Sequence, residues 1–259
     1  MFIQNICISQ DSLVTNVKPD LKYLKSYFTD TKDLLIAPVK WNYKEWIVLG
    51  GTSLTTLIII NNDKPVYDWF QDNRNTTTDN VSKYGLEPWG SGLYSMPLMG
   101  LFYLHGSIYE NNRSKNVALN GVKAFLLSGL MVQIPKYLFN RHRPYNGDFP
   151  DPYVWDGPFT GKYYKSFFSG HTTTVFSVAT VIASEYSDKQ LIPVITYTIA
   201  GISAVSRIND NKHWASDVFA GAVFGYAIGK LIHNNNKIGV TVYPITSINS
   251  NGILIKYSL

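Results

Sequence analysis

The sequence predicts an all-α protein, a bundle of about six core helices that is followed by a short C-terminal β-hairpin. Apolar stretches of helical length alternate with polar or turn-rich segments, which predicts the helices. Several stretches contain small residues, such as Gly201, Gly221 and Gly225, which allow helices to approach closely. The apolar stretches cover residues 46–60, 93–104, 117–139, 174–184 with 191–205, and 218–232.

The first 40 residues are expected to form an N-terminal segment. Residues 1–12 lack the basic and apolar regions of a complete secretory signal, although residues 9–12 resemble the end of one. A truncated signal peptide and a frayed cytoplasmic N-terminus both fit this stretch. Apolar residues recur at helical spacing over residues 18–40, which predicts an amphipathic surface helix closed by Pro38.

Residues 41–233 are expected to form the main domain, and the sequence leaves its relation to a bilayer open. A membrane span needs about 20 apolar residues, whereas a stretch of about 10–15 is more typical of a core helix. Most of the stretches are short or carry polar residues such as Asn120 and Lys123. Residues 71–92 and 144–168 are polar and turn-rich, so both are expected to be loops, and the second has a length typical of functional loops.

Residues 234–259 have the pattern of a β-hairpin. Apolar and polar residues alternate over 239–245, and residues 249–252 have the composition of a turn. The alternation resumes at Ile253. A packing strap, a dimer contact and a membrane contact are all compatible with this tail.

The composition excludes several classes of protein. Apolar residues make up 45% of the 259 residues, which is too many for a disordered chain. The net charge of +5 arises from 23 basic and 18 acidic residues without any long basic run, so nucleic-acid binding is not expected. The mild excess suits an anionic ligand or membrane surface. Cys7 is the single cysteine, which excludes an intrachain disulfide and a cysteine-based zinc site.

Two histidines have neighbours that suggest chemistry. His213 and Asp217 are four residues apart, so on a helix they would share one face and the carboxylate could orient the imidazole. A surface His–Asp pair is the structural alternative. Ser169-Gly170 precede His171 at the start of an apolar stretch, where helix N-terminal amides can bind an anion and Ser169 can act as N-cap. The other histidines, His105, His142 and His233, are expected to be structural.

Three basic residues suggest a phosphate clamp. Lys136 and Arg143 bracket the end of the stretch over 117–139, with Arg141 between them, and Arg207 follows the stretch over 191–205. Lysine supplies a point charge and arginine a planar fork that matches two phosphate oxygens. Favourable charges at helix C-termini are the structural alternative.

Together these residues form an ordered pattern. It reads Lys136-x6-Arg143-Pro144, then Ser169-Gly170-His171, then Ser206-Arg207-x5-His213-x3-Asp217. This pattern resembles the type 2 phosphatidic acid phosphatase (PAP2) superfamily, which includes bacterial acid phosphatases and vanadium haloperoxidases. The resemblance covers residues 46–232 and fills every charged or histidine position of the three motifs. Phe168 stands where the family usually has proline, which bears on substrate preference more than on activity.

The resemblance implies a metal-independent phosphatase without a cofactor. His213 would be the nucleophile that forms a phosphohistidine, Asp217 would orient it, and His171 would protonate the leaving alcohol and later activate water. The phosphoryl oxygens would be held by Lys136, Arg143, Arg207, Ser169 and Gly170. The resemblance also implies a bacterial-type cell-envelope protein, membrane-associated or periplasmic, whose active site faces the non-cytoplasmic side.

The substrate remains open at this stage. Apolar helices, abundant aromatic residues and a mild positive charge favour a lipid phosphate at a membrane face, such as phosphatidic acid, phosphatidylglycerol phosphate, polyprenyl diphosphate or lipid A. A soluble periplasmic acid phosphatase acting on small phosphomonoesters is the main alternative. A vanadium haloperoxidase and a non-catalytic binder of lipid phosphates are further alternatives.

Overall fold

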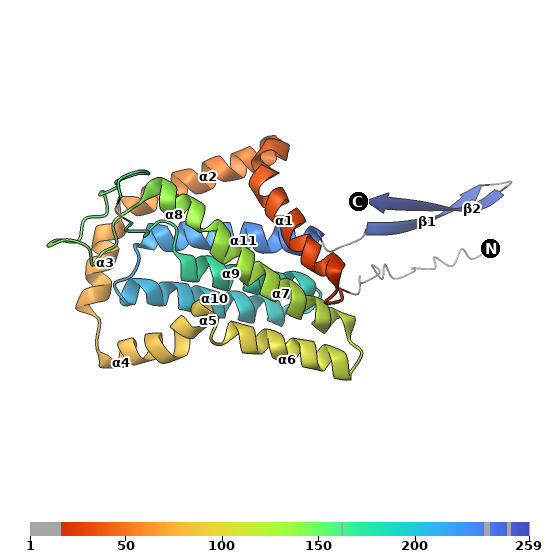
Figure 1. The fold of residues 1–259 in the computed structure, drawn as a ribbon, viewed down its shortest axis with the longest axis horizontal. Coiled ribbons are helices and arrows are strands. Elements are labelled where there is room, and N and C mark those ends of the chain that lie inside the picture. Colours follow the sequence, from red (N-terminus) through yellow and green to blue (C-terminus); the bar gives the residue numbers. More distant parts are fainter. Residues whose placement is uncertain (1–16, 162, 236–238, 248–249, 259) are drawn as a thin grey trace, which may run out of the picture.

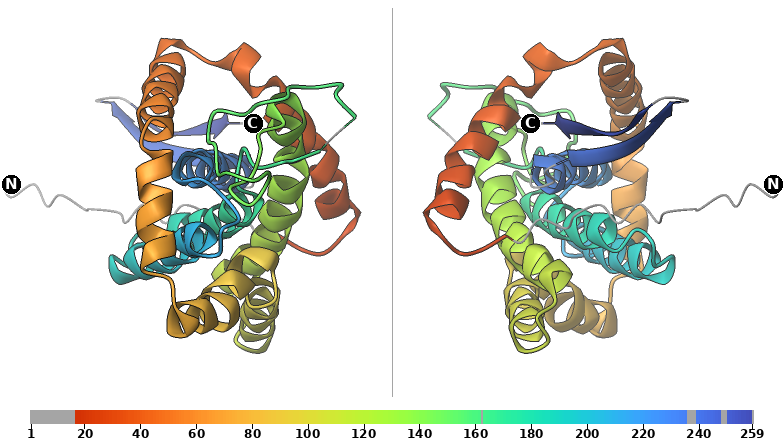
Figure 2. Two further views of the ribbon diagram at one scale, coloured as in Figure 1. Left: turned by 90° about the vertical axis from the view of Figure 1, so that its left-hand side faces the viewer. Right: turned by 90° about the vertical axis from the view of Figure 1, so that its right-hand side faces the viewer.

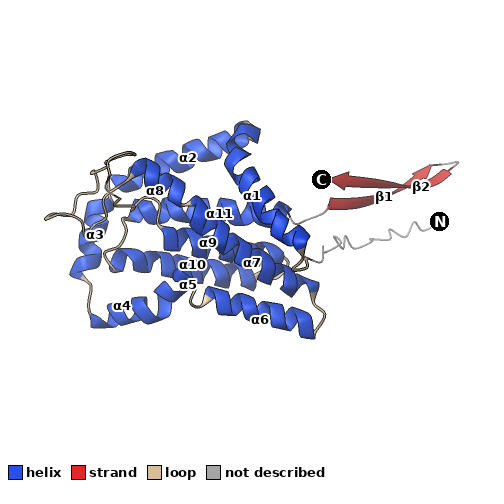
Figure 3. Ribbon diagram, viewed as in Figure 1, coloured by secondary structure: helices blue, strands red, loops and turns tan. Residues whose placement is uncertain are grey.

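The protein is a bundle of helices with a two-stranded hairpin at its C-terminal end (Figures 1 and 3). The computed structural model describes residues 17–161, 163–235, 239–247 and 250–258. The expected signal-peptide remnant and Cys7 therefore lie outside the described residues. The elements are α1 (Leu21–Lys40), α2 (Tyr43–Ile60), α3 (Asp63–Asp72), α4 (Thr76–Asn80), the π-helix η1 (Val81–Leu86), α5 (Glu87–Ser91), α6 (Ser95–Ile108), α7 (Asn112–Met131), α8 (Gln133–Phe139), α9 (Gly170–Glu185), α10 (Leu191–Asn209), α11 (Ala215–Asn235), β1 (Gly239–Ser247) and β2 (Ser250–Ser258).

Helix α9 is the centre of the bundle, with α7, α10 and α11 packed around it (Figure 2). One apolar cluster joins three of these helices and consists of Ala124, Leu127 and Met131 from α7, Val181 from α9, and Ile228 and Ile232 from α11. The all-α prediction is confirmed, and its apolar stretches correspond to α2, α6, α7 with α8, α9, α10 and α11.

Glycines on α11 let it lie against the backbone of α9. Gly221, Gly225 and Gly229 recur every four residues and so share one face of the helix. A Cβ atom at Gly225 would lie 2.3 Å from the carbonyl oxygen of Thr173, and one at Gly221 would lie 2.7 Å from that of Ser169. This close approach places the N-terminus of α9 beside the start of α11.

The segment 71–92, expected to be a loop, is largely helical. Asn75 Oδ1 accepts hydrogen bonds from the backbone N–H groups of Thr77 and Thr78, at 2.9 and 3.1 Å, and the Thr78 hydroxyl oxygen accepts one from the Asn75 N–H. The polar residues that resembled a turn are therefore the N-terminal cap of α4. Helices η1 and α5 follow without a break.

Lys123, which interrupts an apolar stretch, is paired inside the bundle. Its ammonium lies 2.7 Å from the carboxylate of Asp30, and both side chains are buried. This ion pair ties α1 to α7, and Asn235 of α11 adds a 2.9 Å hydrogen bond to the same carboxylate. A buried charge needs such a partner.

The strands β1 and β2 pair antiparallel, with Ser247 opposite Ser250. Residues 250–252, which were expected to be part of the turn, lie within β2 opposite residues 245–247. The domain boundaries at residues 40 and 233 stay predictions.

The outside of the bundle carries a broad apolar surface. Within the described residues, three helical segments are long and apolar enough to cross a membrane: Asn112–Phe139, Leu191–Asn209 and Ala215–Asn235. Large apolar side chains are more than half exposed on α2, α6 and α10, which is unusual for a soluble monomer. They include Ile47, Val48, Leu54, Leu57, Ile58, Leu101, Leu104, Val194 and Ile195.

Candidate active site

Helices α8 and α10 end, and α9 begins, at one end of the bundle (Figure 1). A cavity of about 270 Å³ is lined by residues of these helix ends and of the adjoining loops. Most of the side chains that the sequence nominates converge on it from separate helices and loops, although up to 77 residues separate them along the chain. The residues that line it are Lys136, Arg143, Gly170, His171, Arg207, Lys212 and His213. Lys212 was not foreseen, because it lies between the motif positions.

The cavity has a strongly cationic lining. Lys136 is buried and its ammonium donates a 2.6 Å hydrogen bond to the carbonyl oxygen of Lys165. The Nε atoms of Arg143 and Arg207 are buried without a hydrogen-bond partner among the described residues. Buried guanidinium donors without partners are costly, and an oxyanion in the cavity would satisfy them.

His213 and Asp217 meet, but not in the way that the spacing predicted. His213 precedes α11 and lies outside it, whereas Asp217 lies in the first turn of that helix. The Asp217 Oδ2 atom accepts a 2.9 Å hydrogen bond from the Trp214 N–H and lies 3.5 Å from His213 Nδ1. Ser166 donates a further short hydrogen bond to the same oxygen. The Asp217 carboxylate thus holds the residues directly before α11 against the start of that helix, which places the His213 imidazole beside it.

Burial keeps the His213 imidazole neutral. Loss of solvent lowers the pKa of His213 to about 3, although the Asp217 carboxylate acts in the opposite direction. A neutral imidazole keeps a free lone pair on one nitrogen, which is the form that can attack phosphorus.

Arg141 does not line the cavity but forms an ion pair with Asp217. Its guanidinium is fully buried and lies 2.7 Å from Asp217 Oδ1 and 2.7 Å from Asp63 Oδ2. Asp63, on α3, also accepts a 2.9 Å hydrogen bond from the Ser216 N–H. Sequence reasoning missed Asp63 and the role of Arg141, since nothing in the sequence links α3 to the last motif.

Ser169 is buried and occupies the N-cap position of α9, but its hydroxyl does not cap the helix. That hydroxyl instead accepts a 2.9 Å hydrogen bond from the Thr172 hydroxyl. The expected side-chain cap is therefore wrong. The Ser169 N–H donates to the carbonyl oxygen of Asp217 at 3.0 Å, which ties the second motif to the third. Ser169 does not line the cavity, whereas the adjacent Gly170 and His171 do.

His171 has a carboxylate partner that the sequence did not reveal. Its Nε2 atom lies 2.8 Å from Glu87 Oε1, at the start of α5. Burial and the nearby Arg207 charge lower the pKa of His171, and the Glu87 carboxylate opposes them. Glu87 was missed because it lies in the segment that was expected to be a loop.

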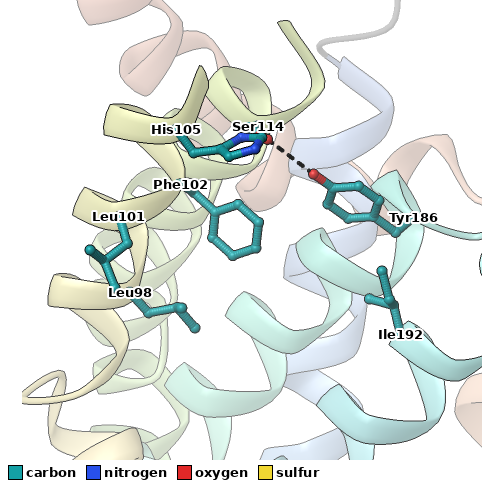
Figure 4. Close-up of a pocket in the computed structure, with 7 residues that line it drawn as sticks. All are labelled: Leu98, Leu101, Phe102, His105, Ser114, Tyr186 and Ile192. Carbon is teal, nitrogen blue, oxygen red and sulfur yellow. Dashed lines mark hydrogen bonds between the residues drawn. The ribbon is translucent and has the colours of Figure 1, made fainter. Parts of the chain in front are cut away.

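The remaining histidines lie elsewhere. His142 pairs with Asp156 at 3.1 Å, and His233 lies 3.4 Å from Glu185. His105 lines a second cavity, of about 380 Å³, at the opposite end of α7 (Figure 4). There the Ser114 hydroxyl joins His105 to Tyr186 at 3.0 and 3.2 Å. No lysine or arginine is among the described residues that line this second cavity, whereas four basic side chains line the first.

The chain is similar to known proteins in sequence. A sequence model described as the PAP2 superfamily matches residues 118–237. The chain is 30% identical over 200 residues to a lipid A 1-phosphatase of Porphyromonas gingivalis. The aligned region covers 76% of this chain and 39% of that protein. The chain thus spans about two fifths of the length of this curated relative.

Two crystal structures have a similar fold. One is LpxE of Aquifex aeolicus, with a TM-score of 0.51 and 24% identity over 66% of this chain and 94% of that one. The other is a transmembrane PAP2-type phosphatidylglycerolphosphate phosphatase of Bacillus subtilis, with a TM-score of 0.56 and 19% identity over 72% of this chain and 94% of that one.

Proposed function

We propose that the chain, whose residues 118–237 match the sequence model of the PAP2 superfamily, is a metal-independent phosphatase that hydrolyses the phosphate groups of lipids through a phosphohistidine intermediate. The observation that carries this proposal is the cavity, where two imidazoles and the side chains of Lys136, Arg143 and Arg207 surround one small space.

In the proposed reaction His213 attacks phosphorus with its free nitrogen, and Asp217 stabilises the charge that develops on the imidazole. His171 gives a proton to the leaving alcohol as the P–O bond breaks. In the second half, His171 accepts a proton from water, which displaces phosphate from His213. Each step uses a side chain that lines the cavity or contacts one that does.

Electrostatics account for the cations. A phosphoryl transition state spreads negative charge over three equatorial oxygens, so catalysis depends mainly on positioning and charge stabilisation. Lys136, Arg143 and Arg207 place three basic groups there, which carry positive charge beside a bound phosphate, with the Gly170 amide at the start of α9. These charges would do the work that metal ions do in other phosphatases.

The apolar exterior supports a lipid substrate. The three long apolar segments and the exposed side chains of α2, α6 and α10 fit a protein embedded in a bilayer. In that placement the cavity, at one end of the bundle, would lie near the headgroups. A lipid phosphate such as the 1-phosphate of lipid A is therefore the proposed substrate, on the non-cytoplasmic side of a cell-envelope membrane. A small phosphomonoester in the periplasm is the alternative.

A phosphate-release panel tests the proposal. Detergent-solubilised protein is incubated with lipid A, phosphatidic acid, phosphatidylglycerol phosphate, polyprenyl diphosphate and p-nitrophenyl phosphate. We expect faster release from a lipid than from the small ester, and no release by His213→Ala. Replacement of His171, the proposed general acid, is expected to lower the rate of phosphate release from a lipid about 10²–10⁴-fold. An inactive wild type, or an active His213→Ala, would contradict the proposal.

A further inference from the structure

Glu87 makes a direct contact with the proposed general acid. Its Oε1 atom lies 2.8 Å from His171 Nε2, and the side chains of Glu87 and His171 are 30% and 36% exposed. This contact resembles the pairing of His213 with Asp217, so each imidazole of the cavity has a carboxylate of its own.

The backbone around Glu87 is held in place from two sides. The carbonyl oxygen of Leu86, directly before it, accepts a 2.8 Å hydrogen bond from Ser203 of α10. The carbonyl oxygen of Gly90 accepts a 2.6 Å hydrogen bond from Thr174 of α9. A Cβ atom at Gly90 would lie 2.8 Å from the His171 Cβ atom, so α5 lies directly against His171. The backbone that carries Glu87 is therefore held beside His171 by packing.

Three charged groups act on the His171 imidazole. Arg207 of α10 and Arg143 of the loop after α8 disfavour a positive ring, and Glu87 of α5 favours it. A general acid must carry a proton when the substrate is bound, and Glu87 is the one anion among these three groups.

We propose that Glu87 is a positioning residue that holds the Nε2–H of His171 and thereby directs the Nδ1 proton of the charged ring to the leaving oxygen. The inference rests on the proposed phosphatase function. As His213 forms the P–N bond, the electrons of the P–O bond stay with the ester oxygen, which takes the Nδ1 proton. The neutral ring stays hydrogen-bonded to Glu87 through Nε2–H, so Nδ1 is free to accept a proton from water in the second half of the reaction.

Leaving-group dependence separates this role from a structural one. An alkyl alcohol is a poor leaving group and needs the proton, whereas p-nitrophenolate leaves without it. We expect Glu87→Gln to lower the first-turnover rate of alcohol release from an alkyl or lipid phosphate about 10–100-fold, part of the range for general acids. For p-nitrophenyl phosphate the first-turnover rate should fall less than about threefold, because that step needs no proton. Glu110→Gln, an exposed change beyond the end of α6, is the matched control and should leave both rates unchanged.

The pH profile and a double variant complete the test. Loss of the Glu87 charge favours the neutral ring, so the alkaline limb of the alkyl-ester profile should move to lower pH in Glu87→Gln and stay nearer its wild-type position in Glu87→Asp. Glu87→Gln combined with His171→Gln should lower the rate on the alkyl ester no further than His171→Gln alone does. Equal losses on both esters, or an unmoved alkaline limb, would overturn the role of Glu87 while leaving the phosphatase proposal intact. A wild type that hydrolyses neither ester would overturn both.

Discussion

Removal of the Arg141 guanidinium tests the network behind the cavity. Arg141→Met keeps much of the side-chain volume but leaves the carboxylates of Asp63 and Asp217 without their shared cation. All three side chains are fully buried, and the N···O distances to the carboxylates are 2.7 Å. Breaking a buried ion pair from one side costs about 3–5 kcal/mol. For a domain of this size that corresponds to a fall in Tm of about 6–20 °C.

Thermal unfolding in detergent, followed by tryptophan fluorescence, measures this loss, because Trp155 and Trp214 flank the guanidinium. Arg74→Met is the matched control, since Arg74 pairs with Asp79 at the surface, where an ion pair adds little to stability. Asp63→Asn, which leaves Arg141 paired with Asp217, is expected to cost an intermediate amount of about 1.5–3 kcal/mol. An Arg141→Met protein that unfolds within about 2 °C of the Arg74→Met control would refute the reasoning.

Three further outcomes follow from the structure. Because burial lowers the pKa of His213 to about 3, the unfolded chain binds a proton at His213 below about pH 6.5 that the folded protein does not, so the free energy of unfolding should fall with pH by at most about 1.4 kcal/mol per pH unit. The difference in Tm between wild type and His213→Asn should therefore shrink between pH 7 and pH 5. A constant difference would contradict the lowered pKa. Gly225→Ala should destabilise the protein by about 1–3 kcal/mol, since its Cβ would lie 2.3 Å from the Thr173 carbonyl oxygen, whereas Gly201→Ala, with open space around it, should be neutral or stabilising; equal Tm values would contradict this. EDTA should leave phosphate release unchanged and vanadate should inhibit it, and a strong loss with EDTA would count against metal-independent turnover.

The sequence motifs identified the cavity side chains because their spacing is fixed by short local structure. His213 and Asp217 illustrate both the strength and the limit of this reasoning. Their spacing brings them together, but through a loop that the Asp217 carboxylate caps instead of through a shared helix face. The spatial pairing of His213 with Asp217 was thus predicted, although its local geometry was not.

The supporting residues could not be predicted, because tertiary packing alone brings them to the site. Asp63 reaches Arg141 across 78 positions, and Glu87 reaches His171 across 84. Neither carboxylate belongs to a pattern of its own. Glu87 was hidden further because the polar residues from Asn75 onward resembled a loop, although they cap a helix. Local sequence patterns indicate caps, turns and periodicity, but they carry little information about which distant residue satisfies a buried charge.

The identity of the covalent intermediate tests the central claim most directly. His171→Gln should retain the attack of His213 on p-nitrophenyl phosphate but be slow to activate water, so the phosphorylated protein should accumulate. After a rapid alkaline quench, mass spectrometry of the peptides should find the phosphate on His213, in a form that acid removes. Release of p-nitrophenol with phosphate on another residue, or with no phosphate on the protein, would contradict the account.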